Sequence, residues 1–99
     1  KASVTFRGDA TGDHRYHRGM RVAASATKHG ISAEEGINAA SFPTWVAPLG
    51  DDLAQWRALR LGFDTRARIL ETVVVAAFDG DEFLIHAMKA RSKYVDRLR

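Results

Sequence analysis

The chain has 99 residues and a net charge of +3. Of these residues, 45% are apolar and 27% are charged, and none is a cysteine. These values suit one folded domain with one core and exclude a disordered chain, a disulfide scaffold and thiolate chemistry. No apolar run approaches the length of a membrane span and the first residues lack a signal-peptide pattern, so we expect a cytoplasmic protein without a membrane partner.

The charges are distributed unevenly along the chain. Residues 1–30 contain six Lys or Arg and two Asp (+4), residues 31–82 contain four Lys or Arg and nine Asp or Glu (−5), and residues 83–99 contain five Lys or Arg and one Asp (+4). If the two basic ends meet in the folded protein, they form a positive patch suited to phosphate groups or to an acidic partner. Solvated charges on a small domain are the alternative.

The first predicted elements are a strand and a helix. The stretch "ASVTF" at residues 2–6 alternates polar and apolar residues as a strand does, and residues 7–13 form a loop. From Arg15 to His29, apolar residues recur at helical intervals. Gly30 follows this helix, at a position that favours a left-handed terminator.

A second, short helix is predicted from Ala33 to Ser41. The stretch "SAEE", which begins at Ser32, matches a capping box, and Pro43 ends the helix. The two helices then pack as a hairpin across Gly30. The stretch "TWVAP", Thr44 to Pro48, is short, aromatic and closed by proline, as edge strands are.

Three more strands and a last helical segment complete the chain. Residues 55–63 predict a strand, and the apolar, β-branched residues 69–78 predict a central strand covered on both faces. The turn signal Asp79–Gly80 connects this strand to a last one over residues 82–89, and a short helix begins at a Ser92 cap.

This order of elements predicts an α+β fold in a single domain over residues 1–99. An N-terminal strand and a helix hairpin pack on one face of an antiparallel meander of three or four strands, and a short C-terminal helix follows.

Two stretches carry a resemblance to a known family. The "KHGIS-AEE" junction, Lys28 to Glu35, and the meander "RALRLGFDTRARILETVVVAAFDGDEFLIHAMKAR" resemble the small toxins of bacterial toxin–antitoxin pairs, and most closely the BrnT family within the broader RelE/ParE-like group. The resemblance covers roughly Tyr16 to Tyr94. It implies a compact toxin that cuts RNA and is silenced by a partner antitoxin, which often also binds DNA.

The residues supply the parts that metal-free RNA cleavage needs. A base must take the proton of a ribose 2′-OH, a cation must neutralise charge on the phosphorane, and an acid must protonate the leaving 5′-oxygen. Histidine suits the first and last tasks, and arginine suits the second. We predict a site of His86 and Arg91 with Arg60, and keep Lys28 and His29 as a second pair.

Strand parity restricts these combinations, because His86 and Met88 share one face of a strand while Lys89 and Arg91 share the other. Arg91 escapes this restriction if the chain leaves the sheet before Ser92. The predicted RNA-binding residues are cationic or aromatic and flank the predicted site: Arg57, Arg66, Arg68, Lys89, Lys93 and Tyr94.

Each of these assignments has a structural alternative. His86 can be a packing histidine, Lys28 and His29 can be helix-end charges, and the arginines can form the solvated side of a hairpin. The carboxylate of Glu71, in the predicted central strand, either pairs with an arginine or acts as a base, and pairing is the safer interpretation.

No cofactor and no metal site are predicted. His14 and His17 lie three residues apart but lack a clear third ligand, which favours a loop without a metal. The expected partners are RNA, free or on the ribosome, and a cognate antitoxin, in a homodimer or a toxin–antitoxin hetero-oligomer. A non-catalytic module of the same fold that binds nucleic acid or protein is the alternative function.

Overall fold

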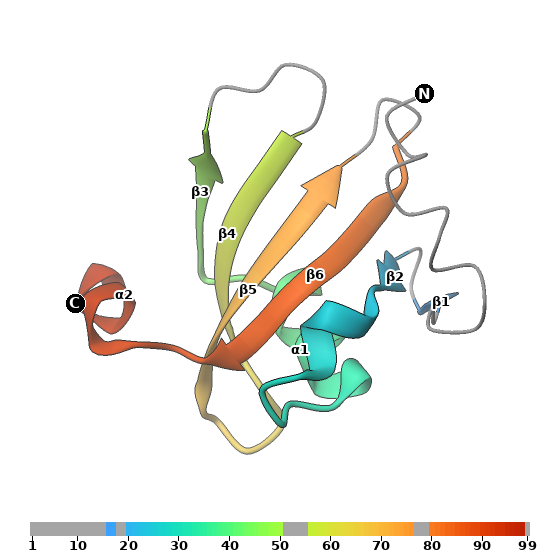
Figure 1. The fold of residues 1–99 in the computed structure, drawn as a ribbon. Coiled ribbons are helices and arrows are strands. Elements are labelled where there is room, and N and C mark those ends of the chain that lie inside the picture. Colours follow the sequence, from blue (N-terminus) through green and yellow to red (C-terminus); the bar gives the residue numbers. More distant parts are fainter. Residues whose placement is uncertain (1–15, 18–19, 51–55, 77–79, 99) are drawn as a thin grey trace.

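The computed structural model describes residues 16–17, 20–50, 56–76 and 80–98, and its centre is a mixed six-stranded sheet (Figure 1). The strands lie in the order β1-β2-β6-β5-β4-β3. Their bounds are β1 Tyr16–His17, β2 Met20–Val22, β3 Trp45–Leu49, β4 Trp56–Phe63, β5 Ile69–Ala76 and β6 Glu82–Lys89. The fold is α+β as predicted, but the sheet is larger than the three or four strands expected.

The strands β3 to β6 follow one another as antiparallel neighbours. β5 lies between β4 and β6 and is mostly buried along its length, because its apolar, β-branched sequence packs on both faces. β3 forms one edge of the sheet. Pro48, which has no backbone N–H, is tolerated there because no further strand of the described residues pairs with the outer side of β3. These placements confirm the predicted central strand and edge strand.

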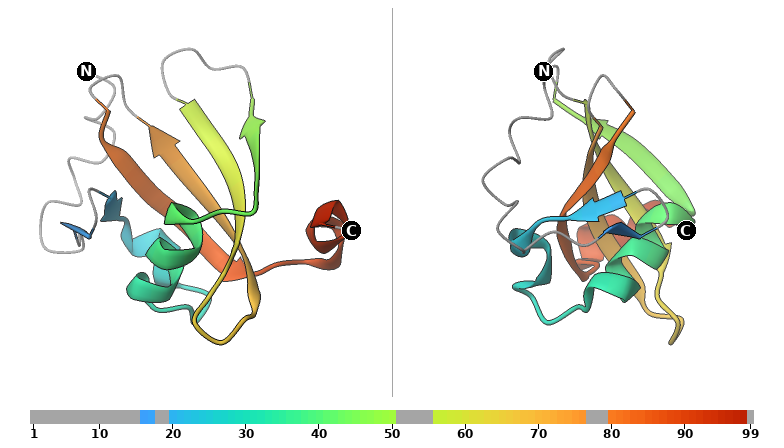
Figure 2. Two further views of the ribbon diagram at one scale, coloured as in Figure 1. Left: turned by 180° about the vertical axis from the view of Figure 1, so that it is seen from behind. Right: turned by 90° about the vertical axis from the view of Figure 1, so that its right-hand side faces the viewer.

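The helix α1, Ala33–Ser41, packs against one face of the sheet (Figure 2). The Ser32 hydroxyl accepts a hydrogen bond from the Glu35 backbone N–H at 3.2 Å, which confirms the predicted cap. Gly62 of β4 allows close packing, because an added Cβ there would lie 2.1 Å from the Ala39 carbonyl oxygen. Ala39 also packs in one cluster with Leu70 and Ala87.

These contacts define two faces of the sheet. The helix face carries Gly62, Leu70 and Ala87 against α1, and the far face carries the residues that alternate with them. Leu61 and Glu71 are cross-strand partners on the far face, and Met88 faces Glu71 from the other side. This register decides the face on which each side chain of β4, β5 and β6 lies.

The predicted helix from Arg15 to His29 is wrong. Residues 20–22 form β2, which pairs in parallel with residues 82–84 of β6, and only residues 24–27 form a short 3₁₀ helix, η2 (Ala24–Thr27). The physical reason is the pairing with β6. In the paired strand Met20 and Val22 bury their side chains while Arg21 between them stays half-buried, which is the alternation of a strand. The described residues before Gly30 therefore contain no α-helix that could form a hairpin with α1. Gly30 does adopt a left-handed conformation, with φ of 85°.

The C-terminal segment forms α2, Ser92–Val95, and η3, Asp96–Leu98. Arg91, and not Ser92, occupies the position before the first helical residue, and it makes no side-chain cap. The guanidinium of Arg97 lies 5.7 Å from the ring centroid of Trp45, so this segment returns to edge strand β3.

The expected strand at residues 2–6 and the loop at residues 7–13 lie outside the described residues, as do residues 51–55 and Asp79. Among the helices of the described ranges, none has the length and apolar character needed to cross a membrane.

Candidate functional site

A buried carboxylate organises the far face where β6 ends. Glu71 of β5 is 1% exposed, and its two oxygens lie within hydrogen-bond distance of groups on two residues that follow it in the chain by 15 and 20 positions. Oε1 accepts from the Arg91 backbone N–H at 3.0 Å and from Arg91 Nε at 3.1 Å. Oε2 lies 2.8 Å from Arg91 Nη2 and 3.0 Å from His86 Nε2. We call Glu71, His86, Arg91 and His29 the Glu71 cluster.

These contacts favour the charged forms of both Glu71 and Arg91. Burial alone would raise the pKa of Glu71, but the hydrogen bonds from Arg91 and His86 outweigh it and bring that pKa below its usual value. The same carboxylate, by hydrogen bonding and by its charge, raises the pKa of the Arg91 guanidinium. The prediction that Glu71 pairs with an arginine is therefore confirmed.

A β-bulge turns His86 towards Glu71. Leu84 pairs with Val74, but His86 pairs with Val73, so Ile85 is an extra residue in β6. Regular alternation would place Leu84 and His86 on one face, whereas the bulge leaves Leu84 in the core beneath α1 and moves His86 to the far face. The Ser25 hydroxyl donates to the Ile85 carbonyl oxygen at 2.7 Å and so ties η2 to the bulge.

His29 reaches the cluster from the other basic end of the chain. Its ring centroid lies 5.3 Å from that of His86, with the two planes at 70°. η2 packs along β6, and the chain turns at Gly30 directly after His29. Lys28, the other member of the predicted second pair, is exposed beside it. The structure therefore unites two residues of the first predicted group, His86 and Arg91, with one residue of the second pair, His29.

Arg91 joins the cluster because the chain has left the sheet. β6 ends at Lys89, and Arg91 adopts φ of −74° and ψ of 153° just before α2, with its side chain turned back to Glu71. Arg91 can therefore lie on the same side as His86, as we expected if the chain leaves the sheet before Ser92. The Arg91 side chain remains 52% exposed, so part of the guanidinium faces solvent.

Tyr94 and Lys93 of α2 border the cluster. The Tyr94 ring centroid lies 5.4 Å from the Arg91 guanidinium carbon and 4.9 Å from Lys93 Nζ, which are cation–π distances. Both residues belong to the predicted RNA-binding set, and both lie on the same side as Arg91. Lys89, at the end of β6, is exposed but pairs with Leu70, so it lies on the helix face and not beside the cluster.

Arg60 does not lie with His86 and Arg91. In the register of β4 and β5, Arg60 faces Thr72 while Leu61 faces Glu71, so parity directs Arg60 to the helix face. There its Nη1 donates to the Ala40 carbonyl oxygen at 3.0 Å, and its Nη2 forms an ion pair with Glu82 at 2.8 Å. The predicted grouping of Arg60 with the other two residues is therefore wrong. Arg60 instead donates a hydrogen bond to a backbone carbonyl in the last turn of α1.

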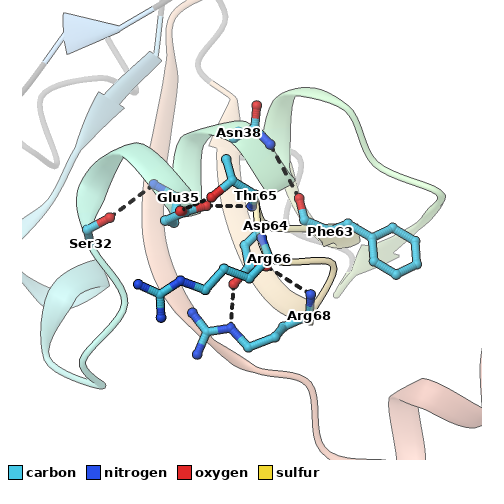
Figure 3. A network of polar contacts seen from close by, with 8 residues as sticks. All are labelled: Ser32, Glu35, Asn38, Phe63, Asp64, Thr65, Arg66 and Arg68. Carbon is cyan, nitrogen blue, oxygen red and sulfur yellow. Dashed lines mark hydrogen bonds and ion pairs between the residues drawn. The ribbon is translucent and has the colours of Figure 1, made fainter.

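The remaining predicted RNA-binding arginines lie elsewhere on the chain. Arg57 is exposed near the start of β4, and Arg66 and Arg68 belong to the turn between β4 and β5 (Figure 3). In this turn Asp64 accepts from the Arg66 and Arg68 backbone N–H groups at 2.8 Å each and from Arg68 Nε at 2.6 Å. Burial raises the pKa of Asp64, but these hydrogen bonds outweigh it and lower the pKa overall.

The same turn is tied to α1. The Glu35 carboxylate accepts hydrogen bonds from the Thr65 hydroxyl and backbone N–H, which lower the pKa of Glu35, and Asn38 Nδ2 donates to the Phe63 carbonyl oxygen at 3.4 Å (Figure 3). Glu35 thus serves the turn as well as its own helix. The contacts around Asp64 and Glu35 are those of a structural support.

Within the described ranges, no group of three or more His, Cys, Asp or Glu side chains lies close enough to hold a metal ion. The His14–His17 pair is outside this finding, because His14 and the side chain of His17 are not described.

Sequence reasoning identified His29, His86 and Arg91 but placed Glu71 outside the site. The signal for Glu71 was present, since a carboxylate in the middle of "ILETVVVAAF" must find partners when it is buried. What no sequence pattern showed was that both partners come from the same short C-terminal stretch.

Comparisons of the chain with known protein families, with curated proteins and with solved structures found no match.

Proposed function

We propose that this chain is a BrnT-like toxin of a toxin–antitoxin pair: a metal-independent endoribonuclease that cuts RNA, inhibits translation and is neutralised by a DNA-binding antitoxin. The observation that carries the proposal is the meeting of His29 with His86 and Arg91, from two segments far apart in the sequence, around one buried carboxylate. Two imidazoles and a guanidinium are the groups that cleavage by 2′-OH attack requires.

In the proposed reaction, one imidazole takes the proton of the 2′-OH as O2′ forms a bond to phosphorus. The bond from phosphorus to O5′ breaks, and the second imidazole gives a proton to O5′. The products are a 2′,3′-cyclic phosphate and a free 5′-OH. Arg91, kept charged by Glu71 and 52% exposed, stabilises the negative charge on the phosphorane oxygens.

Exposed cations near the cluster support a role in holding the RNA chain or an acidic antitoxin segment. Lys28 follows η2 and Lys93 lies in α2, and both are exposed. A polyanion passing the cluster would meet them. The antitoxin is then proposed to cover the same region in a hetero-oligomer, in the cytoplasm where RNA is available.

A non-catalytic module that binds nucleic acid or protein is the second candidate. The observation that favours it is that Arg91 already directs Nε and Nη2 to Glu71, as a structural arginine does. Under this candidate RNA affinity falls gradually as cations are removed, and no cleavage occurs at any stage.

The test of the first proposal is cleavage of an RNA oligonucleotide by the purified chain in excess EDTA, with analysis of the ends produced. We expect fragments with a 2′,3′-cyclic phosphate and a 5′-OH, and no cleavage when the nucleotide at the cut position carries a single 2′-deoxy sugar. Cleavage of the 2′-deoxy strand, or a strict need for added Mg²⁺, would contradict the proposed chemistry.

Expression in bacteria tests the toxin role separately. Growth should stop when the chain is expressed alone and should recover when the neighbouring gene is expressed with it. Unimpaired growth at a protein level sufficient for cleavage in vitro would exclude the toxin role.

A further inference from the structure

The hydrogen bonds at Glu71 restrict where the proton of His86 can be. Three of the four groups directed at the carboxylate are N–H donors of Arg91, namely the backbone N, Nε and Nη2. A protonated carboxyl group would need an acceptor for its own hydrogen, and none of these three groups can accept one. The fourth group, His86 Nε2, could accept it, but a neutral carboxyl group would leave the Arg91 guanidinium 2.8 Å away without its anionic partner. Burial raises the pKa of Glu71, but the hydrogen bonds from Arg91 lower it overall, so Glu71 is an ionised acceptor towards its partners.

His86 must then be the donor in its contact with Glu71. Its Nε2 lies 3.0 Å from Oε2, on a side chain that is 1% exposed. A neutral imidazole with its proton on Nδ1 would turn the lone pair of Nε2 towards the oxygen, which places two acceptors in contact without water. A proton on Nε2 removes this conflict and forms a charge-assisted hydrogen bond.

We infer that Glu71 is a positioning residue that fixes His86 in the Nε2–H tautomer, so that Nδ1 is the nitrogen of His86 that gains and loses a proton and meets the RNA. The part of this inference that concerns RNA rests on the proposed function. The His86 side chain is 24% exposed, so the ring is accessible while one of its nitrogens is held by Glu71. In this arrangement Nδ1 exchanges a proton with the 2′-OH or with O5′.

The inference has a direct spectroscopic test on the full chain, without RNA. Long-range ¹H–¹⁵N correlation spectra of the histidine rings distinguish a protonated from an unprotonated ring nitrogen, and the His86 signals are those missing from a His86→Gln variant. At alkaline pH we expect His86 to show a protonated Nε2 and an unprotonated Nδ1. A proton on Nδ1, or a mixture of tautomers, would overturn the inference.

The isosteric variant Glu71→Gln tests whether Glu71 causes the tautomer. Two Arg91 donors converge on Oε1, so the amide oxygen should take that place and the amide NH₂ should occupy the place of Oε2. There the NH₂ group leaves Arg91 Nη2 without its acceptor, a conflict with one donor where the reverse amide orientation would have two. The same NH₂ group donates to Nε2, which then has to lose its proton. We expect the His86 tautomer to reverse to Nδ1–H, and an unchanged spectrum would overturn the causal role of Glu71. Glu34→Gln, at an exposed position of α1, is the control and should leave the spectrum unchanged.

Cleavage assays on the same variants separate this inference from the proposed function. If His86 acts through Nδ1, Glu71→Gln should lower the cleavage rate at least tenfold, change its pH profile and leave RNA affinity unchanged. An Nε2–H signature in a protein that never cuts RNA would overturn the proposed function and support the tautomer assignment. Undiminished cleavage in a variant with a reversed tautomer would overturn the role of Nδ1.

Discussion

Glu71 is the residue on which the geometry of the cluster depends. It is buried in the central strand, and it holds both the imidazole of His86 and the backbone and guanidinium of Arg91. Because one carboxylate positions two candidate catalytic groups, its removal should affect stability and chemistry together. These two effects have different pH dependences and can be measured separately.

The first prediction concerns acid stability. The pKa of folded Glu71 lies below its ordinary value of 4.5, so the ionised form stabilises the fold above that pH, and this stabilisation is lost as the pH falls through the folded pKa. At about pH 7, Glu71→Gln should cost about 1.5–3 kcal/mol, since it weakens hydrogen bonds to a charged group. Thermal unfolding followed from neutral to acidic pH should show the melting temperatures of the two proteins converging.

The control for this measurement is Glu34→Gln, which removes one carboxylate from an exposed position of α1. A difference between wild type and Glu71→Gln that stayed constant down to about pH 3 would show that ionised Glu71 does not stabilise the fold.

The second prediction concerns the shape of Arg91. Lys at this position would keep the positive charge but lose the two-point contact through Nε and Nη2. We expect Arg91→Lys and Arg91→Ala both to slow RNA cleavage by at least tenfold, with RNA affinity changed less than the rate. Single-turnover rates and equilibrium binding to a 2′-deoxy-substituted strand measure the two quantities. Full activity in Arg91→Lys would show that charge alone is sufficient.

At the residue scale, the sequence predicted the types of group in the site better than their arrangement. His86 and Arg91 were correctly paired because Arg91 lies beyond the strand, where parity no longer applies. Arg60 was misplaced because its face depends on the register between β4 and β5, which the sequence does not specify by itself. The bulge at Ile85 could not be predicted from the sequence either, since it depends on pairing with β5 and on a hydrogen bond from Ser25.

At the scale of elements, the packing of α1 on the sheet supports the cluster from the opposite face. α1 contacts β4, β5 and β6, the strands that carry or flank Glu71 and His86. Gly62 is the point of closest approach, since the Ala39 backbone occupies the space that a side chain would need. The distance between helix and sheet is therefore set by the absence of a side chain.

The third prediction tests this close contact between Gly62 and the Ala39 backbone. In Gly62→Ala the added Cβ would lie 2.1 Å from the Ala39 carbonyl oxygen, so α1 must move away from the sheet. We expect a loss of about 3 kcal/mol in the free energy of unfolding, measured by urea denaturation. The matched control is Gly80→Ala, where nothing lies within 4 Å and only the φ of 92° opposes a side chain, at a cost of about 1–2 kcal/mol. Equal stabilities of the two variants would contradict the proposed tight contact.

Elements with a strong local pattern were predicted well. α1 has a Ser cap and a following proline, β5 has a long apolar run, and β6 begins and ends at the predicted residues. The segment from Arg15 to His29 failed because its apolar spacing also fits alternation over three residues, and pairing with β6 decided between the two. Local sequence cannot identify a parallel partner some 60 residues away.

At the scale of the molecule, the fold brings parts of the two basic ends of the chain together. β2 and η2 lie along β6, and His29 contacts His86, so residues 20–30 run beside residues 82–89 (Figure 1). The uneven charge distribution predicted this meeting as one of two alternatives. The meeting is confirmed for residues 20–30 and 82–89, whereas Arg97 of the last segment packs on Trp45 at the opposite edge of the sheet.

The fourth prediction follows from the exposed cations near that meeting. RNA affinity should fall with salt, and replacing Lys28 and Lys93 together with Ala should reduce the slope of log K against log salt by about 0.7 for each phosphate that the variant no longer neutralises. Arg66→Ala, in the turn between β4 and β5, is the comparison and should change the slope less. If Arg66→Ala produced the larger change, the RNA would bind at the turn and not at the Glu71 cluster.

The most direct test of the whole account is the single-turnover rate of RNA cleavage in EDTA for His86→Ala and Arg60→Ala, measured on folded protein below the melting temperature of each variant. The two residues were grouped by the sequence and are separated by the structure, on opposite faces of the sheet. The account predicts that His86→Ala loses about 10²–10⁴-fold in rate while Arg60→Ala stays close to wild type. Unchanged cleavage in His86→Ala, or comparable losses in both variants, would contradict it.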